Sequence, residues 1–514
     1  MGGSEHIVMV PFMAHGHLIP FLGLAQRLHH RTGFRVTLAT TPLNVKYLTS
    51  CIDTAGEDSA AAKQSIRLVA LPFSCADNGL PPNSENTEAL PLHHMITIIR
   101  STHSLKEPFR DLIADITAGD GKPPLCIISD VFIGWGSEVA RACGTVNVSF
   151  TTSGAYGTTA YNSFWRNLPH LTAAGADRED GEGEFAIPGF PDSCRFNLSH
   201  LHPYMRAADG TDPWSNVIQS FVSDSLDSFG SLCNTVEEIE PLGSEALRSF
   251  TKLPVWCVGP LIPPAMLKDG QASLDIAGKR TGKVHGLSPE KCREWLDEQS
   301  EGSVLYISFG SQNTISASQM MELGLGLKDS GKAFIWVIRP PIGFDIKGEF
   351  KSEWLPEGFL EENQADRRGP KQGLVIHGWA PQLEILWHKS TGAFLSHCGW
   401  NSSLESLSQG VPLIGWPMAG EQAFNSKMMA EELGVCIELT KGVKSNIARD
   451  DVKRVIDIVL GSREMKEKAG RVKDSIRAAV KEENAAADRG GKGSSLRAID
   501  DFVSSLLSRR RVPV

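Results

Sequence analysis

The 514-residue sequence predicts an α/β protein made of two Rossmann-like domains that face each other across a cleft. Short apolar segments alternate with amphipathic segments in both halves of the chain, a pattern typical of parallel sheets covered by helices on both faces. In each half the first apolar segment runs into a polar, glycine-containing turn, at residues 11–17 and 308–311. The length also exceeds one ordinary hydrophobic core, so two domains are expected.

The N-terminal domain is predicted to begin with a βαβ unit. Residues 7–10 form an apolar strand, residues 18–31 carry apolar side chains at helical spacing, and a second strand begins at Phe34. Residues 125–130 are another buried type of strand, which ends on a carboxylate. We assign residues 1–260 to this domain.

The composition changes at residues 261–289, which are rich in Pro, Gly and Lys and lack periodicity, so we interpret them as the inter-domain linker. A second α/β domain is predicted over residues 290–484. A last helix near residues 493–508 is expected to pack back on the N-terminal domain. The strand segments of the second domain are SVLYISFGS, AFIWVIR, GLVIHGW, AFLSHCG and VPLIGWP.

Charge and cysteine content argue against several classes of protein. The net charge is −9 and the one dense basic run is residues 509–511, so nucleic acid is not an expected partner. The ten cysteines form no CxxC pair and no Cys/His ligand spacing, which predicts reduced thiols, no metal site and a cytoplasmic location. No signal peptide and no apolar run of about 18 residues is present, so we expect no membrane span. We expect a monomer.

Ligands of open parallel sheets lie beyond the carboxyl ends of the strands. This rule predicts an inter-domain cleft lined by the residues that follow the predicted strands: His15, His17, Asp130, Ser311, Trp379 and His397.

The segment 379–422 contains the densest set of candidate binding residues. After the strand that delivers His397, Gly399 makes a tight turn and Asn401 is expected to start a helix, whose free N–H groups suit a phosphate. Asn401 and Ser402 are placed where capping residues belong. Glu405, four residues after Asn401, shares its helix face and could accept from vicinal hydroxyls.

Two further positions in this segment suit a nucleotide sugar. Trp379, at a strand end, offers a flat face for a base, and Glu421 with Gln422 could bind sugar hydroxyls. Each residue alone could equally be a cap, a packed Trp or a surface Glu. Their combination on the strand ends of one domain favours a binding site.

The same 44 residues closely resemble the nucleotide-sugar box of plant family 1 UDP-dependent glycosyltransferases. The elements WAPQ, HCGWNS, the following Glu and EQ all lie at the spacing of that family. Supporting matches are PFMAHGHLIP, SDVFIGW, TSGAY, NTVEEIEP, VGPLIP and SFGS. The resemblance implies a GT-B fold, no metal or other cofactor, and inverting transfer from a UDP-sugar to a small acceptor.

The resemblance also implies roles for individual residues. Trp379 would stack on uracil, and the Ala380 backbone would read the edge of the base. Gln382 and Glu405 would hold the ribose. The diphosphate would be held by Ser311, His397, Asn401 and Ser402, and the sugar by Trp400, Glu421 and Gln422. Gln422 at the last position favours UDP-glucose, and xylose or glucuronate donors stay open.

His17, in the GHxxP pattern of the family, is the implied catalytic base, and Asp130 is its implied partner. The chemistry requires such a pair, because an acceptor hydroxyl is a weak nucleophile at pH 7. A histidine has the right pKa, and a carboxylate on its second nitrogen fixes the tautomer and stabilises the imidazolium.

The acceptor pocket is expected from N-domain segments with Ala419 from the other domain. Apolar and aromatic residues there suit a flavonoid, another phenolic or a terpenoid, glucosylated at a hydroxyl or carboxyl group to give a β-glucoside and UDP. The predicted pocket residues are Phe12, His15, Phe132, Tyr156 and Ala419.

Other functions stay open at this level. A UDP-sugar-binding protein without catalysis would need the same box, although the intact His17 and Asp130 argue against it. A nucleotide-sugar epimerase of GT-B architecture would need no organic acceptor, and the hydrophobic N-domain segments argue against that. An NAD-linked dehydrogenase lacks its GxGxxG fingerprint here.

Overall fold

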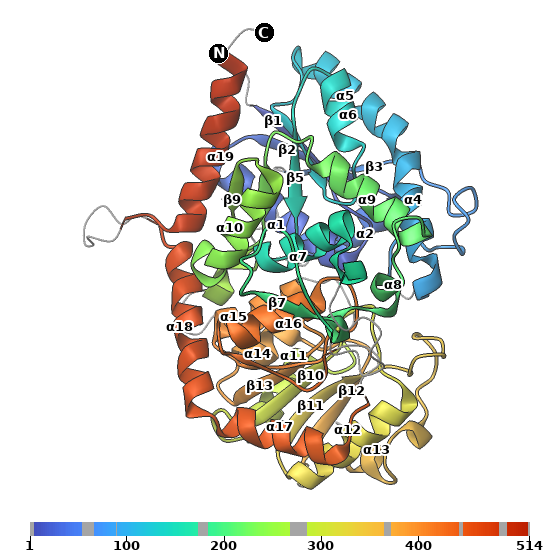
Figure 1. Ribbon diagram of the computed structural model, residues 1–514, viewed down its shortest axis with the longest axis vertical. Coiled ribbons are helices and arrows are strands. Elements are labelled where there is room, and N and C mark those ends of the chain that lie inside the picture. Colours follow the sequence, from blue (N-terminus) through green and yellow to red (C-terminus); the bar gives the residue numbers. More distant parts are fainter. Residues whose placement is uncertain are drawn as a thin grey trace.

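The computed structural model describes residues 5–53, 66–88, 90–172, 183–267, 285–363, 372–441, 446–482 and 491–511. Two parallel sheets, each covered by helices, stack along the long axis of the molecule (Figure 1). The predicted class, two α/β domains, is confirmed. Most of the predicted linker, residues 268–284, lies outside the described residues.

The N-terminal sheet has seven parallel strands in the order β3-β2-β1-β4-β5-β8-β9. Every residue of β1 and β4 is buried, and most are apolar, which fits their place side by side within this sheet. The strands are β1 (His6–Val10), β2 (Arg35–Thr40), β3 (Ile66–Ala70), β4 (Cys126–Asp130), β5 (Asn147–Thr151), β8 (Ser231–Cys233) and β9 (Val255–Cys257). A separate antiparallel hairpin pairs β6 (Glu184–Ala186) with β7 (Arg195–Asn197).

The α-helices of this domain connect the strands in the right order for a Rossmann-like unit. They are α1 (His15–Thr32), α2 (Pro42–Asp53), α4 (Met95–Ser101), α5 (Lys106–Asp120), α6 (Gly136–Ala142), α7 (Ala155–Asn167), α8 (Pro203–Arg206), α9 (Pro213–Ser225) and α10 (Pro241–Thr251). The first helix starts at His15, three residues earlier than predicted, so both histidines of the turn lie in its first turn.

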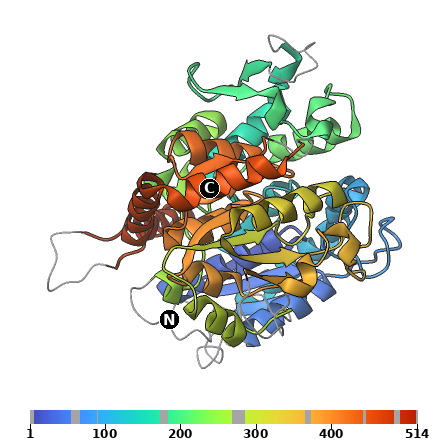
Figure 2. The ribbon, with the colours of Figure 1, turned by 90° about the horizontal axis from the view of Figure 1, so that it is seen from below.

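The C-terminal sheet has six parallel strands in the order β12-β11-β10-β13-β14-β15, with helices on both of its faces (Figure 2). The strands are β10 (Val304–Ser308), β11 (Ala333–Ile338), β12 (Gly373–His377), β13 (Thr391–Ser396), β14 (Leu413–Gly415) and β15 (Cys436–Glu438). The helices are α11 (Pro289–Asp297), α12 (Ala317–Ser330), α13 (Phe359–Glu362), α14 (Gln382–Trp387), α15 (Trp400–Gln409), α16 (Gln422–Glu431), α17 (Arg449–Gly461) and α18 (Arg463–Ala479).

The chain returns to the N-terminal domain through α19 (Ser494–Arg511), which lies along one side of the molecule next to α18 (Figure 1). Phe502 of α19 packs 5.2 Å from Trp256 of β9, measured between ring centroids, and the Trp256 indole N–H donates to Asp501 at 2.7 Å. Phe502 and Leu506 lie in the same buried cluster as Leu18 of α1. The helix predicted at residues 493–508 therefore closes the core of the N-terminal domain.

Candidate functional site

A cavity of about 140 Å³ lies between the two domains, at the carboxyl ends of β1 and of the C-terminal strands. The N-terminal domain contributes the first turn of α1, and the C-terminal domain contributes the segments that follow β10, β11, β12 and β13. Predicted donor-site residues in its lining are Ser311, Trp379, Ala380, Gln382, Asn401, Ser402 and Glu405.

The two residues predicted to hold a ribose are hydrogen-bonded to each other. The Gln382 amide donates to Glu405 at 2.7 Å and to the Ser402 hydroxyl at 3.1 Å, and its oxygen accepts from the Tyr306 hydroxyl at 3.2 Å. All four side chains are partly or fully buried, so their rotamers are restricted before a ligand arrives. Such a preorganised polar network suits recognition of hydroxyl groups.

His397, which follows β13, lies between two glycines. A Cβ atom at Gly310 would lie 2.6 Å from His397 Nε2, and one at Gly399 would lie 2.4 Å from the same atom. Burial, together with the charge of Arg339, lowers the pKa of His397 to about 4. His397 is therefore neutral at pH 7 and can offer a diphosphate one N–H donor but no positive charge.

The start of α15 differs from the prediction by one residue. Gly399 is the N-cap and Trp400 is the first helical residue, so Asn401 and Ser402 lie in the first turn and do not cap it. The Trp400 ring is 3% exposed and its indole N–H donates to the Asn234 carbonyl at 2.7 Å, so the prediction that this residue holds the sugar now concerns its backbone. The Trp400 backbone N–H, one of the first N–H groups of the helix, has no partner within it.

Asn401 joins the donor side of the site to the turn that carries the catalytic candidate. Its amide donates to the Gly16 carbonyl at 2.7 Å across the domain interface. Pro20 lies four residues after Gly16 within α1 and has no N–H, so the Gly16 carbonyl lacks its normal helical donor. The proline thus leaves this carbonyl available to Asn401 of the other domain.

The predicted sugar-binding pair lies at the start of α16. The Gln422 oxygen accepts the backbone N–H groups of Met418 and Ala419, both at 2.9 Å, so its NH₂ group is the part left for a ligand. One oxygen of Glu421 accepts from Ser153 of the N-terminal domain at 3.0 Å. The turn that contains Ala419 is therefore held close to the N-terminal domain.

The predicted catalytic pair is assembled in the structure. His17 Nδ1, on α1, donates to Asp130 Oδ2, at the end of β4, at 2.7 Å. The neighbouring strands β1 and β4 bring these two distant parts of the chain together. Among the described residues, His17 Nε2 has no hydrogen-bond partner, and 21% of the side chain is exposed. Nε2 is therefore available to take a proton.

The environment of His17 fits a general base. Burial lowers the pKa of His17, but the charge of Asp130 and its hydrogen bond outweigh burial, and Glu421 adds to them, so the pKa is raised above its usual value. Asp130 is buried and also accepts the Phe132 backbone N–H at 3.0 Å, which fixes the carboxylate. The imidazole of this pair therefore holds its proton more firmly than a histidine side chain in water does.

Of the predicted acceptor residues, two lie next to His17. The rings of Phe12 and Phe132 are 5.3 Å and 5.7 Å from the His17 ring, and only Phe132 is partly exposed. Tyr156, also predicted in the acceptor pocket, is 1% exposed and packs against Phe190 in the core, so its role in binding an acceptor stays a prediction. The α7 segment carries Tyr156 on its buried side.

His15, predicted both to line the inter-domain cleft and to contribute to the acceptor pocket, lies on the donor side of the cleft. It lines the donor cavity, stacks on Tyr47 at 4.2 Å between ring centroids, and faces the edge of Trp379 at 6.5 Å. Successive helical positions turn by about 100°, so His15 and His17 on α1 face different parts of the cleft.

Replacing Phe132 by alanine is expected to raise the KM of a hydrophobic acceptor about tenfold, because a half-buried aromatic contact contributes about 1–2 kcal/mol. The KM of the UDP-sugar should change little. Steady-state kinetics with each substrate varied in turn measure both values. Tyr156→Phe is the matched control, since the ring is buried away from the cleft; a larger effect on acceptor KM from this variant than from Phe132→Ala would contradict the assignment.

Arg339, which follows β11, lines the same cavity and is absent from the predicted site. The signal that could have found it was present, since it stands directly after the apolar strand AFIWVI, at the same sheet edge as the other ligands. A single Arg after a strand, however, belongs to no motif of its own.

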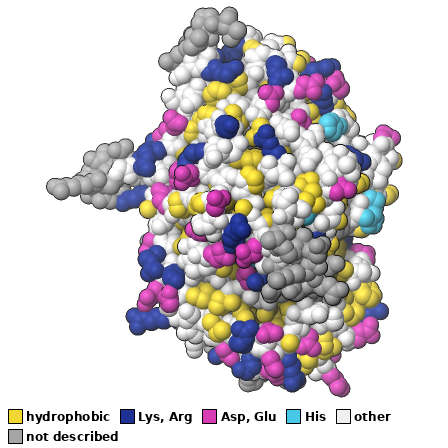
Figure 3. Space-filling view, in the orientation of Figure 1, with side chains coloured by type: hydrophobic (Ala, Val, Ile, Leu, Met, Phe, Trp, Pro, Cys, Tyr) yellow, Lys and Arg dark blue, Asp and Glu magenta, His cyan; other side chains and the backbone are white. Residues whose placement is uncertain are grey.

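Three properties bear on the partners of the protein. On the face in Figure 3, Lys and Arg side chains are scattered among Asp and Glu. Within the described ranges, no group of three or more His, Cys, Asp or Glu side chains is placed to hold a metal ion. None of the described helices is long and apolar enough to cross a bilayer.

Comparisons with known proteins agree with this geometry. Residues 4–159 match the glycosyltransferase N-terminal domain family, and residues 274–475 match the family described as UDP-glucoronosyl and UDP-glucosyl transferase. UDP-glycosyltransferase 92A1 of Arabidopsis thaliana is 38% identical to this chain over 98% of it and 97% of the relative. Crocetin glucosyltransferase 3 of Crocus sativus is 41% identical over 89% of this chain and 90% of the relative.

The solved structure of Glycyrrhiza uralensis UGT73P12, complexed with glycyrrhetinic acid 3-O-monoglucuronide, superposes with a TM-score of 0.80 at 26% identity. The match covers 99% of this chain and 96% of that structure, which confirms the predicted GT-B fold. The chain is therefore a member of the plant UDP-glycosyltransferase family, an enzyme that transfers a sugar from a UDP-sugar to a small molecule.

Proposed function

We propose that this enzyme transfers glucose from UDP-glucose to a hydroxyl or carboxyl group of a small hydrophobic metabolite, such as a flavonoid, another phenolic or a terpenoid. The transfer inverts the anomeric centre and uses no metal ion or other cofactor. The observation that carries the proposal is the His17–Asp130 pair at 2.7 Å, facing the cleft between the donor cavity and the N-domain aromatic rings.

In this mechanism His17 Nε2 removes the proton of the acceptor as its oxygen attacks the anomeric carbon in a single displacement. Asp130 stabilises the imidazolium that forms. The bond to UDP breaks on the opposite face of the sugar, and negative charge develops on the diphosphate. The first turn of α15 and the neutral His397 donate hydrogen bonds to that charge. The products are a β-glucoside and UDP.

Gln422 supports glucose as the donor sugar, because its NH₂ group is the free part of a side chain whose oxygen is held by two backbone N–H groups. The Crocus sativus relative is named a glucosyltransferase, which agrees with this choice. A cytoplasmic, monomeric protein is part of the same proposal; ten cysteines that are all free thiols support the reducing compartment.

The deciding experiment incubates the protein with UDP-glucose and a panel of phenols, terpenoid alcohols and carboxylic acids, followed by mass spectrometry. An acceptor that gains a hexose, with the product lost in His17→Ala, is the expected result. Release of UDP without a conjugate would mean that the donor site works and the panel lacks the acceptor. Neither conjugate nor UDP with UDP-glucose, but turnover with another UDP-sugar, would overturn the choice of glucose.

The pH dependence of kcat/KM provides a second test. His17 acts when it is unprotonated, so kcat/KM is expected to rise with pH through an ionisation above 6.5, the usual value, because its pKa is raised. In Asp130→Asn the raising charge is lost while burial still lowers the pKa, so the midpoint should move to lower pH and the plateau should fall. A midpoint that stays in place in this variant would contradict the role of Asp130.

A further inference from the structure

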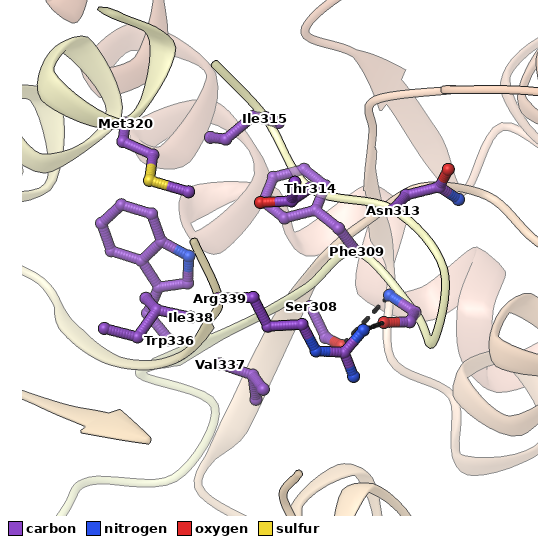
Figure 4. A pocket seen from close by; sticks show the side chains of 11 residues that line it. Ser308, Phe309, Asn313, Thr314, Ile315, Met320, Trp336, Val337, Ile338 and Arg339 are labelled. Atoms are coloured by element: carbon purple, nitrogen blue, oxygen red, sulfur yellow. Dashed lines mark hydrogen bonds between the residues drawn. The ribbon is translucent and has the colours of Figure 1, made fainter. Parts of the chain in front are cut away.

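Arg339 connects two segments of the donor cavity. Its guanidinium donates to the Gly310 carbonyl at 2.7 Å, in the segment after β10, and to the Gly378 carbonyl at 3.3 and 3.4 Å, in the segment after β12. Figure 4 shows the side chain directed back along the sheet edge toward Ser308 and the β10 segment. Arg339 follows β11, which lies between β10 and β12 in the sheet, so its position suits this bridging role.

The same guanidinium lies over the ring of Trp379, 5.3 Å from its centroid. A cation over an indole face is attracted by the π electrons, and Arg is the residue that most often makes this contact. The contacts to Trp379 and Gly310 therefore place the charge between the predicted base-stacking residue and the predicted diphosphate segment.

Arg339 is the fixed positive charge that the described lining of the donor cavity contains. Among the described residues that line it, Arg339 is the sole Lys or Arg. The second candidate cation, His397, is neutral at pH 7, since burial and the nearby Arg339 depress its pKa. A UDP-sugar carries a negatively charged diphosphate, and a helix N-terminus supplies only partial charge to it.

The guanidinium has donors to spare for such a ligand. Of its five N–H groups, three make the hydrogen bonds to Gly310 and Gly378, which leaves one on each terminal nitrogen. Burial lowers the pKa of Arg339, and the nearby Glu88 of the N-terminal domain and Tyr306 act in the opposite direction. Arg keeps its proton in proteins, so the charge is present at all working pH values.

We propose that Arg339 binds the diphosphate of the UDP-sugar, as a donor-recognition residue that supplies the fixed positive charge of the described cavity lining. The proposal rests on the proposed function, which assigns this cavity to the UDP-sugar. The contacts with the Gly310 and Gly378 carbonyls and with the Trp379 ring fix the Arg339 side chain before the ligand binds. The planar guanidinium can donate two parallel hydrogen bonds to phosphate oxygens.

Calorimetric titration with UDP and with uridine tests the proposal, because only UDP carries the diphosphate. Arg339→Gln is expected to weaken the affinity for UDP at least tenfold and the affinity for uridine less than threefold. Arg339→Lys keeps the charge and should retain most of the preference for UDP over uridine. The difference between UDP and uridine in the wild type should shrink as salt is added. Arg454→Gln, an exposed Arg on α17, is the matched control for loss of a distant charge.

Each outcome separates the possibilities. If Arg339→Gln weakens the affinities for UDP and uridine equally, Arg339 only supports the Trp379 ring. If neither affinity falls, Arg339 has no role in binding. Both results overturn the proposal. If Arg339→Gln does not fold, as judged by its melting temperature, Arg339→Lys decides: loss of the UDP preference in that variant overturns the proposal. Wild-type protein that does not bind UDP would instead overturn the proposed function.

Discussion

Replacing His17 by alanine is expected to lower kcat for transfer to an aliphatic alcohol by about 10²–10⁴-fold, the usual contribution of a general base. The Kd of UDP should change less than twofold, because the side chain points to Asp130 and the two Phe rings and is not among the residues that line the donor cavity. Single-turnover kinetics and calorimetric titration measure the two quantities.

The acidity of the acceptor provides the internal control for this prediction. A phenol needs less help in losing its proton than an alcohol, and a carboxylic acid needs almost none. The penalty of His17→Ala should therefore fall in the order alcohol, phenol, carboxylic acid. Equal penalties for a phenol and an alcohol would mean that His17 acts in some other way than by taking the proton.

His15→Ala is a matched variant two residues away. His15 lines the donor cavity and faces Trp379, so its loss should raise the KM of the UDP-sugar and leave the ranking of acceptors intact. If the penalty depended on acceptor acidity in His15→Ala and not in His17→Ala, His15 would be the general base.

The sequence predicted the elements whose residue patterns are local. Apolar runs located β1 and β4, and the rule that ligands lie at strand ends brought His17 and Asp130 into one candidate site, where the structure places them 2.7 Å apart. The periodic pattern of 18–31 identified α1 but missed its first turn, because Gly16 and the two histidines are neither apolar nor strong helix formers.

Burial is decided by distant parts of the chain, so no local pattern shows which aromatic side chains are buried. The Trp400 indole N–H donates to the Asn234 carbonyl of the N-terminal domain, whereas Tyr156 on α7 packs against Phe190 in the core of its own domain. Arg339 is absent from the predicted site for another reason, since a single Arg after a strand belongs to no motif.

Replacing Gly399 by alanine is expected to weaken the binding of UDP at least tenfold. The backbone there has φ −61°, so alanine introduces no backbone strain, and the effect isolates the contact of the new Cβ with His397. That Cβ would lie 2.4 Å from His397 Nε2, so the imidazole must move. The ring cannot retreat freely, because Gly310 borders it on another side and His397 is 8% exposed.

The expected loss follows from the size of such contacts: forcing extra atoms into a packed site costs about 1–3 kcal/mol, which corresponds to roughly ten- to a hundredfold in affinity. Calorimetric titration with UDP measures it. Gly470→Ala is the matched control, since this glycine lies within α18 with no atom within 4 Å of its added Cβ, and alanine there should leave UDP affinity unchanged and stabilise the helix by about 0.5–1 kcal/mol. If Gly399→Ala bound UDP as tightly as the wild type, the position of the His397 ring would not matter for the donor, and its assignment to the diphosphate would be wrong.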